Sequence, residues 1–407
     1  MSVHVSADSD VNVSLMRLLN SNADNADLDQ SIRWEATGDY PASRHVDTCV
    51  GSFATGPIPA SASAAGDWTL GALVWSGNVS VTGRQSVVDV SGATSLNLAV
   101  LDGSPTLSYL NAGGEESWSI KSPERLLARS WYLLVGIVTG RQARVEAHPL
   151  DASYGGSSSD TTIIEPLDLT CDVLTVAAGR PRGVTTSGTL PIGVAENLAD
   201  LKIEAPFVAT EALSAGHIAS LVAGAAVQTT VPSLLAAYDF SLRAGDDHHQ
   251  ARPLAPGQEP GILVNHPARG ITGSRYSGAP ISFADAPDEY AAIHFHSHDL
   301  VDSGWPVLLR AQLPDLASGV YGIRVQNKDG EDIVPFVVAP SPTSARNKIA
   351  VILPVFSYLA YANEVMYANL DPKPLTDGEV TISEVDTARL GDRSYGLSLY
   401  DLHPDGT

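Results

Sequence analysis

The feature that most limits this fold is a long series of short apolar segments, each closed by turn residues. Between residues 66 and 241, segments such as 67–75 and 131–138 are rich in Val, Leu and Trp. Turn sequences such as Asp102-Gly103 separate them. Short apolar segments at regular spacing, bounded by Gly and polar turn residues, are typical of antiparallel sheets. Most of this chain is therefore expected to be a β scaffold.

Overall charge excludes some classes of partner. The 407 residues carry 46 acidic and 24 basic side chains, a formal net charge of −22. Binding to phosphate backbones or anionic membranes needs clustered Lys and Arg, so neither nucleic acid nor a membrane is an expected partner. No apolar run approaches the roughly 18–20 residues that span a bilayer. The polar start, residues 1–13, does not resemble a signal peptide, and we expect a cytoplasmic protein.

The strand signals fall into four successive parts. The order of a strand at Trp131-Tyr132, then "KIEAP", "ALSAGHIASL" and "AAYDFS", resembles a concanavalin-A-like or laminin-G-like jelly roll. The hairpin "SGVYGIRV…DIVPFVV", with Asp329-Gly330 at its turn, resembles an immunoglobulin-like unit. We expect an N-terminal β segment at 1–59, the jelly-roll sandwich at 60–241, the immunoglobulin-like β module at 242–340 and an incomplete α/β domain at 347–407.

Near the C-terminus the pattern changes. Residues 349–353 (IAVIL) form a continuous apolar run without alternation, which is typical of a strand buried on both faces of a parallel sheet. One strand and one crossover cannot complete such a sheet before Thr407. The sequence therefore predicts a truncated or split protein whose chemistry begins in this last part.

Within the sandwich, residues 212–223 predict a short helix with Leu213, His217, Leu221 and Val222 on one face.

Several segments, in order, resemble the large subunit family of N,N-dimethylformamidase. They are "EPGILVNHPARGITGSRY", "YAAIHFHSHDLVDSGWP", the hairpin at 318–338, "IAVILPVFSYLAYANE" and "YGLSLYDLHPDG". The resemblance implies an amidohydrolase that splits the C–N bond of small formamides to an amine and formate. It also implies one iron ion (Fe3+) held by tyrosine phenolates and a glutamate, a small second subunit and a homo- or hetero-oligomer. Because further ligands would lie beyond Thr407, we expect an incomplete iron site and an inactive fragment.

The resemblance selects one candidate site residue, and position in the sequence selects the others. Tyr400, in "YDLHPDG", is the candidate metal ligand, with Tyr395 less favoured. Tyr358, Asn363, Glu364 and His403 are the candidate catalytic residues. Tyr358, Tyr361, Asn363 and Glu364 follow the strand predicted at 349–353, and open α/β sheets bind ligands beyond the carboxyl ends of their strands. Each also has a structural interpretation: Tyr400 as a packed tyrosine, and the 358–364 segment as a polar helix cap.

Two further patterns carry alternatives. His294, His296 and His298 alternate, so one strand face would present three imidazoles, which could bind Zn, Fe or Cu or simply be hydrogen-bonded at an edge or interface. The jelly-roll pattern leaves open a carbohydrate-binding or adhesion-type module without catalysis. A sugar site would use Trp68, Trp75 or Trp118, although core packing explains these rings as simply.

Overall fold

The computed structural model describes residues 1–19, 30–41, 46–59, 66–165, 167–186, 190–343, 348–364 and 396–407. They divide into two compact units, which are considered one at a time. The larger unit comprises Cys49–Ser303 with Ser357–Thr407, and the smaller comprises Met1–Thr48 with Gly304–Phe356. In the described ranges, no helix combines the length and apolar character needed to cross a membrane.

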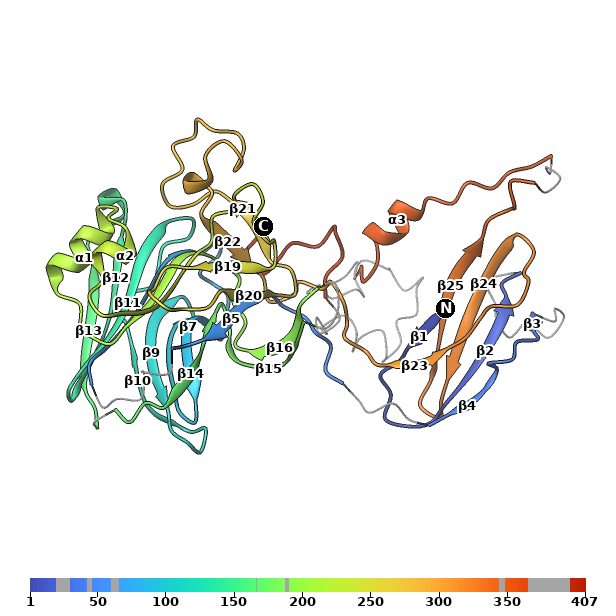
Figure 1. Cartoon of the computed structure of the whole chain (residues 1–407), viewed down its shortest axis with the longest axis horizontal. Helices are drawn as coiled ribbons and strands as arrows, with labels where there is room; N and C mark the ends of the chain where they lie inside the picture. The colour runs from blue at the N-terminus through green and yellow to red at the C-terminus, as the bar shows by residue number, and fades with distance from the viewer. Residues whose placement is uncertain are drawn as a thin grey trace, which may run out of the picture. The chain divides into compact units, whose positions relative to one another are not determined.

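The larger unit is an antiparallel sandwich (Figure 1). In order of pairing, its first layer contains β10 (Glu116–Lys121), β9 (Ser104–Leu110), β8 (Ser95–Leu101), β7 (Arg84–Gly92), β14 (Cys171–Val176), β5 (Phe53–Pro57), β20 (Gly261–Val264) and β19 (Gln250–Pro253). Strand β18 (Leu234–Asp239) connects it to the second layer, which continues through β17 (Leu201–Ala209), β6 (Trp68–Trp75), β11 (Trp131–Thr139), β12 (Gln142–Pro149) and β13 (Ser158–Ile163).

Smaller elements complete this unit. They are the hairpin of β15 (Gly179–Thr185) and β16 (Ile192–Glu196), the pair β21 (Ala268–Ile271) and β22 (Ala292–Phe295), helices α1 (Ala215–Val222) and α2 (Val227–Thr230), and the 3-10 turns η1 (Ala152–Tyr154) and η2 (Pro287–Glu289). Strand β22 pairs with β17, so that His294 lies opposite Lys202. This pairing adds β22 to the second layer of the sandwich.

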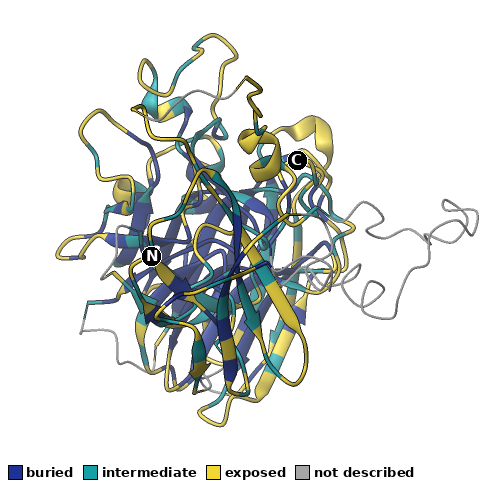
Figure 2. Ribbon diagram, turned by 90° about the vertical axis from the view of Figure 1, so that its right-hand side faces the viewer, coloured by how far each residue is buried: buried dark blue, intermediate teal, exposed yellow. Residues whose placement is uncertain are grey.

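Strand β11 shows why its sequence is apolar almost throughout. Leu134 and Val138 face the core between the two layers, which also contains Leu98 and Phe240. Val135 and Ile137, between them, face a second apolar cluster on the other side of the sheet, against α1. Because successive strand residues point to opposite faces, both sets are apolar when both faces are covered. In Figure 2 buried residues follow the strands, while exposed ones gather in the loops and helices.

Helix α1 covers that second face. Leu213, Ile218 and Leu221 are buried there. His217 was predicted on the same face, but it lies in a capping box instead: its backbone N–H donates to Ser214 Oγ at 3.2 Å, and the Ser214 N–H donates to His217 Nδ1 at 3.4 Å. Such reciprocal bonds satisfy N–H groups that the first helical turn leaves without partners.

The smaller unit brings the N-terminal segment together with residues 304–356. Strand β2 (Val11–Arg17) pairs with β24 (Gly319–Gln326), β3 (Ser31–Ile32) and β4 (Gly38–Tyr40); β25 (Glu331–Val338) pairs with β24; and β1 (Ser2–His4) pairs with β23 (Val307–Arg310). Val13 and Leu15 of β2 and Ile323 of β24 are buried in one cluster. The alternating valines of the N-terminus thus pack against the second β module.

The mainly β fold with a large sandwich is confirmed. The observed division differs from the predicted boundaries, because residues 1–48 pair with the second β module and β19 to β22 belong to the sandwich. A local pattern predicts a strand but carries no information about which distant strand it pairs with.

The buried strand predicted at 349–353 was wrong. Ile349, Val351 and Ile352 are 82%, 81% and 92% exposed, and the segment forms no strand. A parallel strand needs neighbours on both sides for its backbone hydrogen bonds, and no described strand pairs with it. A short helix, α3 (Val355–Ala360), follows this segment.

Candidate functional site

Residues 396–407 fold back onto the larger unit at the loop after β6. Asn78 Nδ2 donates to the Pro404 carbonyl oxygen at 3.1 Å. The His403 and Gly406 N–H groups donate to the Thr407 and His403 carbonyl oxygens at 2.9 and 2.8 Å, which closes a tight turn. At Gly77, an added Cβ would come within 2.4 Å of the Asp405 carbonyl oxygen. Glycine therefore permits this close approach.

The turn delivers two side chains to β22. His294 Nε2 lies 2.7 Å from Asp405 Oδ2, and both residues are buried. The His403 ring stacks on His296 with centroids 3.6 Å apart and planes at 12°, while the His294 and His296 rings are 4.2 Å apart. His296 Nδ1 lies 3.5 Å from Asp299 Oδ1. The candidate metal-binding groups here are His294, His296 and Asp405, and His296, Asp299 and His403; within each, the ligand atoms lie within 4.8 Å.

Burial and charge set the protonation of this cluster. Burial, with a smaller effect from His296, lowers the pKa of His403 to about 4. Burial also lowers the pKa of His294 and outweighs the opposite effect of its hydrogen bond to Asp405. Burial by itself would raise the pKa of Asp405. The hydrogen bonds that it accepts from His294 and Thr407 outweigh burial and lower the pKa to about 2. At neutral pH, His294 and His403 are therefore neutral and Asp405 is ionised.

A second cluster joins the end of α3 to the same segment. The Leu399 N–H donates to the Ala360 carbonyl oxygen at 3.1 Å. The Tyr361 and Tyr400 rings stack with centroids 4.4 Å apart and planes at 29°. Ser398 Oγ donates to Glu364 Oε2. Phenol and carboxylate oxygens from two segments are thus gathered on one surface of the larger unit.

The candidate residues are divided between the two clusters. Tyr400 and Glu364 belong to the oxygen-rich cluster, with Tyr358 60% exposed on α3. Asn363 follows the helix with φ of 61°, in the left-handed region that asparagine tolerates. His403 packs against His296, in the other cluster. Tyr395 lies outside the described residues.

Sequence reasoning found part of the histidine cluster. It placed His294 and His296 on one side of a strand, as observed, while His298 contacts Ser297 with Nδ1 2.6 Å from Oγ. It missed Asp405 and Asp299 as partners of these imidazoles. His403 and Asp405 are two residues apart, as His294 and His296 are, and this spacing could have suggested a second pair of ligands. The contact of this pair with β22 depends on tertiary structure, so the sequence does not predict it.

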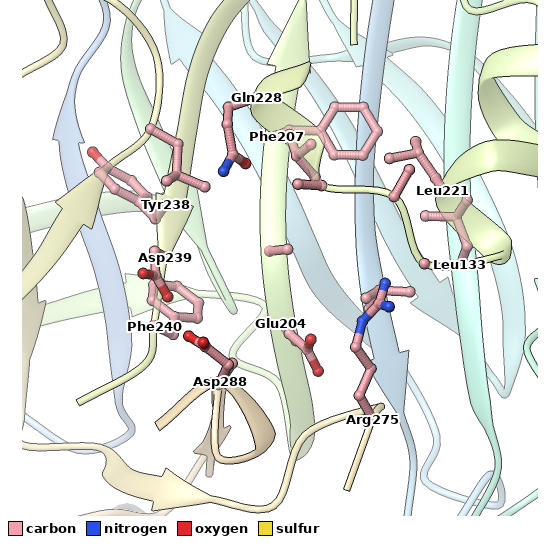
Figure 3. A pocket seen from close by; sticks show the side chains of 18 of the residues that line it. Leu133, Glu204, Phe207, Leu221, Gln228, Tyr238, Asp239, Phe240, Arg275 and Asp288 are labelled. Carbon is pink, nitrogen blue, oxygen red and sulfur yellow. The ribbon is translucent and has the colours of Figure 1, made fainter. Parts of the chain in front are cut away.

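A separate cavity of about 350 Å³ lies on the α1 side of the sandwich (Figure 3). Glu204 of β17, Arg275 and Asp288 point into it beside Phe207 and other apolar side chains. The Ser274 N–H donates to Glu204 Oε2 at 2.6 Å. Burial nevertheless raises the pKa of Glu204 above its ordinary value. This cavity has the size and mixed lining of a small-molecule site.

Sequence similarity to known proteins extends over nearly the whole chain. Residues 269–407 match a family model described as N,N-dimethylformamidase beta subunit-like, C-terminal. The N,N-dimethylformamidase beta subunit of Paracoccus aminophilus is 30% identical over 426 residues, covering 98% of this chain and 55% of that protein. The chain is thus similar, along nearly its whole length, to N,N-dimethylformamidase beta subunits. The beta subunit of an Alcaligenes species is 28% identical, covering 96% of this chain and 54% of that protein.

The chain spans about half the length of these relatives. Among solved structures, a carbohydrate-binding protein from Bacteroides ovatus has a TM-score of 0.35 at 11% identity, covering 57% of this chain and 64% of that one. A pentraxin from Limulus polyphemus has a TM-score of 0.32 at 11% identity, covering 63% and 97%. Both scores are too low to bear on function.

The docking of residues 396–407 predicts that Gly77→Ala disturbs this segment. The new methyl group would meet the Asp405 backbone, and such overpacking costs about 1–3 kcal/mol. Hydrogen exchange of the 396–407 peptide should accelerate by about tenfold or more. Gly66→Ala, where the added carbon meets open space, is the matched control. Unchanged exchange in Gly77→Ala would mean that the segment does not lie against this loop.

Buried Glu204 predicts a pH-dependent stability effect. Because its pKa is raised in the folded chain, its contribution to stability is fully present below the unfolded value of about 4.3 and is lost as the pH rises through the folded value. Glu204→Gln should therefore raise the melting temperature relative to the parent at pH 8, and less at pH 4.5. Glu289, whose pKa is lowered by bonds from Ser277, is the control of opposite sign. An E204Q gain that is equal at both pH values would contradict this account.

Proposed function

We propose that this chain forms part of an amidohydrolase that hydrolyses the C–N bond of small formamides, giving an amine and formate. Sequence similarity supports the reaction class, because the relatives are named N,N-dimethylformamidase beta subunits. The observation that carries the proposal is the contact between Tyr361 and Tyr400 beside Glu364, which unites oxygen donors from two segments of the chain.

Iron fits the chemistry of this donor set. Phenolate and carboxylate oxygens are hard donors, which suit Fe3+. Tyr400 is the proposed ligand in this chain, and Tyr361 is a second phenol beside it. Both rings are more than half exposed, so an ion could approach from solvent. When bound, Fe3+ would polarise the amide carbonyl and lower the pKa of a bound water.

The chain's own residues would orient substrate and water. The Glu364 carboxylate is held by the Ser398 hydroxyl, which also accepts the Tyr400 N–H at 3.1 Å, so the carboxylate is fixed relative to the Tyr400 backbone. Asn363 presents a side-chain amide of the kind that pairs with a substrate amide. Tyr358 lies one helical turn before Tyr361 and would line the same approach.

Partners follow from the same proposal. The relatives are named beta subunits, which implies a partner subunit. We propose a small second subunit in a cytoplasmic hetero-oligomer. A sugar-binding function has less support: Trp68 is 1% exposed, Trp118 stacks on Tyr109, and Trp75 contacts His294.

Tyr400→Phe tests the proposal. Removing the phenol oxygen should lower the iron content and the release of formate from N,N-dimethylformamide together, each by at least about tenfold. The protein should be expressed from its native reading frame with its partner subunit. Tyr154→Phe, on an exposed ring far along the sequence, serves as control. Retention of iron and turnover in Tyr400→Phe, or loss of both in Tyr154→Phe, would contradict the assignment.

A further inference from the structure

Three imidazoles and a carboxylate converge where the C-terminal turn meets β22. His294 and His296 are two residues apart and lie on one side of the strand. His403 and Asp405 are also two residues apart, and the turn closed by Thr407 presents both to that side. We propose that these four residues form a divalent transition-metal site of the zinc class, separate from the oxygen-rich cluster of Tyr361, Tyr400 and Glu364.

The distances are close to what a tetrahedral ion needs. Zinc lies about 2.0–2.2 Å from N and O ligands, which places ligand atoms about 3.3 Å apart. The candidate atoms of His294, His296 and Asp405 already lie within 4.8 Å of one another, and His403 is stacked on His296. Binding would turn the His403 ring out of its stack on His296 so that its nitrogen reaches the ion, which would take the place of the proton between His294 Nε2 and Asp405.

Hydrogen bonding alone does not account for the cluster. The His294–Asp405 bond is short, but His403 Nδ1 is buried with no hydrogen-bond partner in the described part of the chain. The contacts of His296 are long: 3.4 Å from Nε2 to Thr407 Oγ1 and 3.5 Å from Nδ1 to Asp299 Oδ1. Leaving buried imidazole nitrogens without good partners is unfavourable, because their lost contacts with water are not replaced. A metal ion would satisfy them.

The donor set selects the ion. Imidazole nitrogens suit Zn2+ and similar transition metals, whereas Ca2+ and Mg2+ prefer oxygen ligands. A supporting carboxylate is in place as well. Asp299 faces His296 Nδ1 and is itself held by the Ser52 hydroxyl at 2.7 Å. A carboxylate on the far nitrogen commonly orients a metal-bound histidine, so His296 would bind through Nε2.

The location indicates what the ion does. One ligand lies on β22, one directly follows it, and two come from the turn that begins three residues after Tyr400, so the ion would fasten that turn to the sandwich. Lys202 lies opposite His294, with its Nζ 4.4 Å from the Trp75 ring centroid, and its charge opposes cation binding. The ionised Asp405, together with Asp299, offsets that charge.

Titration of the chelator-treated full chain with Zn2+ alone, and with Co2+ alone, tests the site. We expect one equivalent to bind per chain, with the visible absorption of tetrahedral Co2+. His296→Gln should abolish this stoichiometric binding, and Asp299→Asn should weaken it by about 10–100-fold. His298→Gln, two residues along and outside the four ligands, should bind as the parent does. Binding of Zn2+ should also slow hydrogen exchange of the 396–407 peptide in the parent.

Absence of Zn2+ binding in the parent, or equal loss in His296→Gln and His298→Gln, would overturn the proposal and leave a hydrogen-bonded clamp. Tyr400→Phe separates the two proposals. It should keep Zn2+ binding at the histidines even if it loses iron and turnover. Loss of Zn2+ binding in Tyr400→Phe would show that the two clusters are a single site.

Discussion

The contact between His294 and Asp405 is the interaction on which the candidate site depends. It joins a strand in the sheet to a segment more than one hundred residues later, at 2.7 Å and out of water. In a buried environment such a charge-assisted bond is stronger than a neutral one. It fixes the turn that follows Tyr400, and therefore the position from which Tyr400 meets Tyr361.

The sandwich supplies the rigid support for that contact. Strand β22 is hydrogen-bonded to β17, and Phe295, between the two histidines, is buried in the core beside Phe240. Because alternate residues point to opposite faces, anchoring Phe295 in the core directs its two neighbours toward the C-terminal turn. The loop after β6 completes the support through Gly77 and Asn78. Scaffold and site are thus linked through a few well-packed positions.

Strand patterns along the chain predicted the sandwich well, because alternation and turn residues are local properties. β6 (Trp68–Trp75) begins one residue after the predicted segment 67–75, and β11 (Trp131–Thr139) ends one residue after the predicted segment 131–138. Pairing was less predictable: nothing near Val13 indicates that β2 lies against β24. The apolar run at 349–353 was misread, since its periodicity suits a buried strand but burial requires neighbours. Resemblance to known enzymes selected Tyr400, whereas the Asp405 partner of His294 emerged only from the fold.

A double-mutant cycle between His294 and Asp405 tests the central claim most directly. Hydrogen exchange of residues 396–407 would be measured in the parent, His294→Gln, Asp405→Asn and the double variant, all freed of metal by a chelator. If the two side chains hold the segment together, each single change should lose about 1.5–3 kcal/mol of protection and the double variant should lose little more. Additive losses would show that the two residues act independently, and would contradict this account.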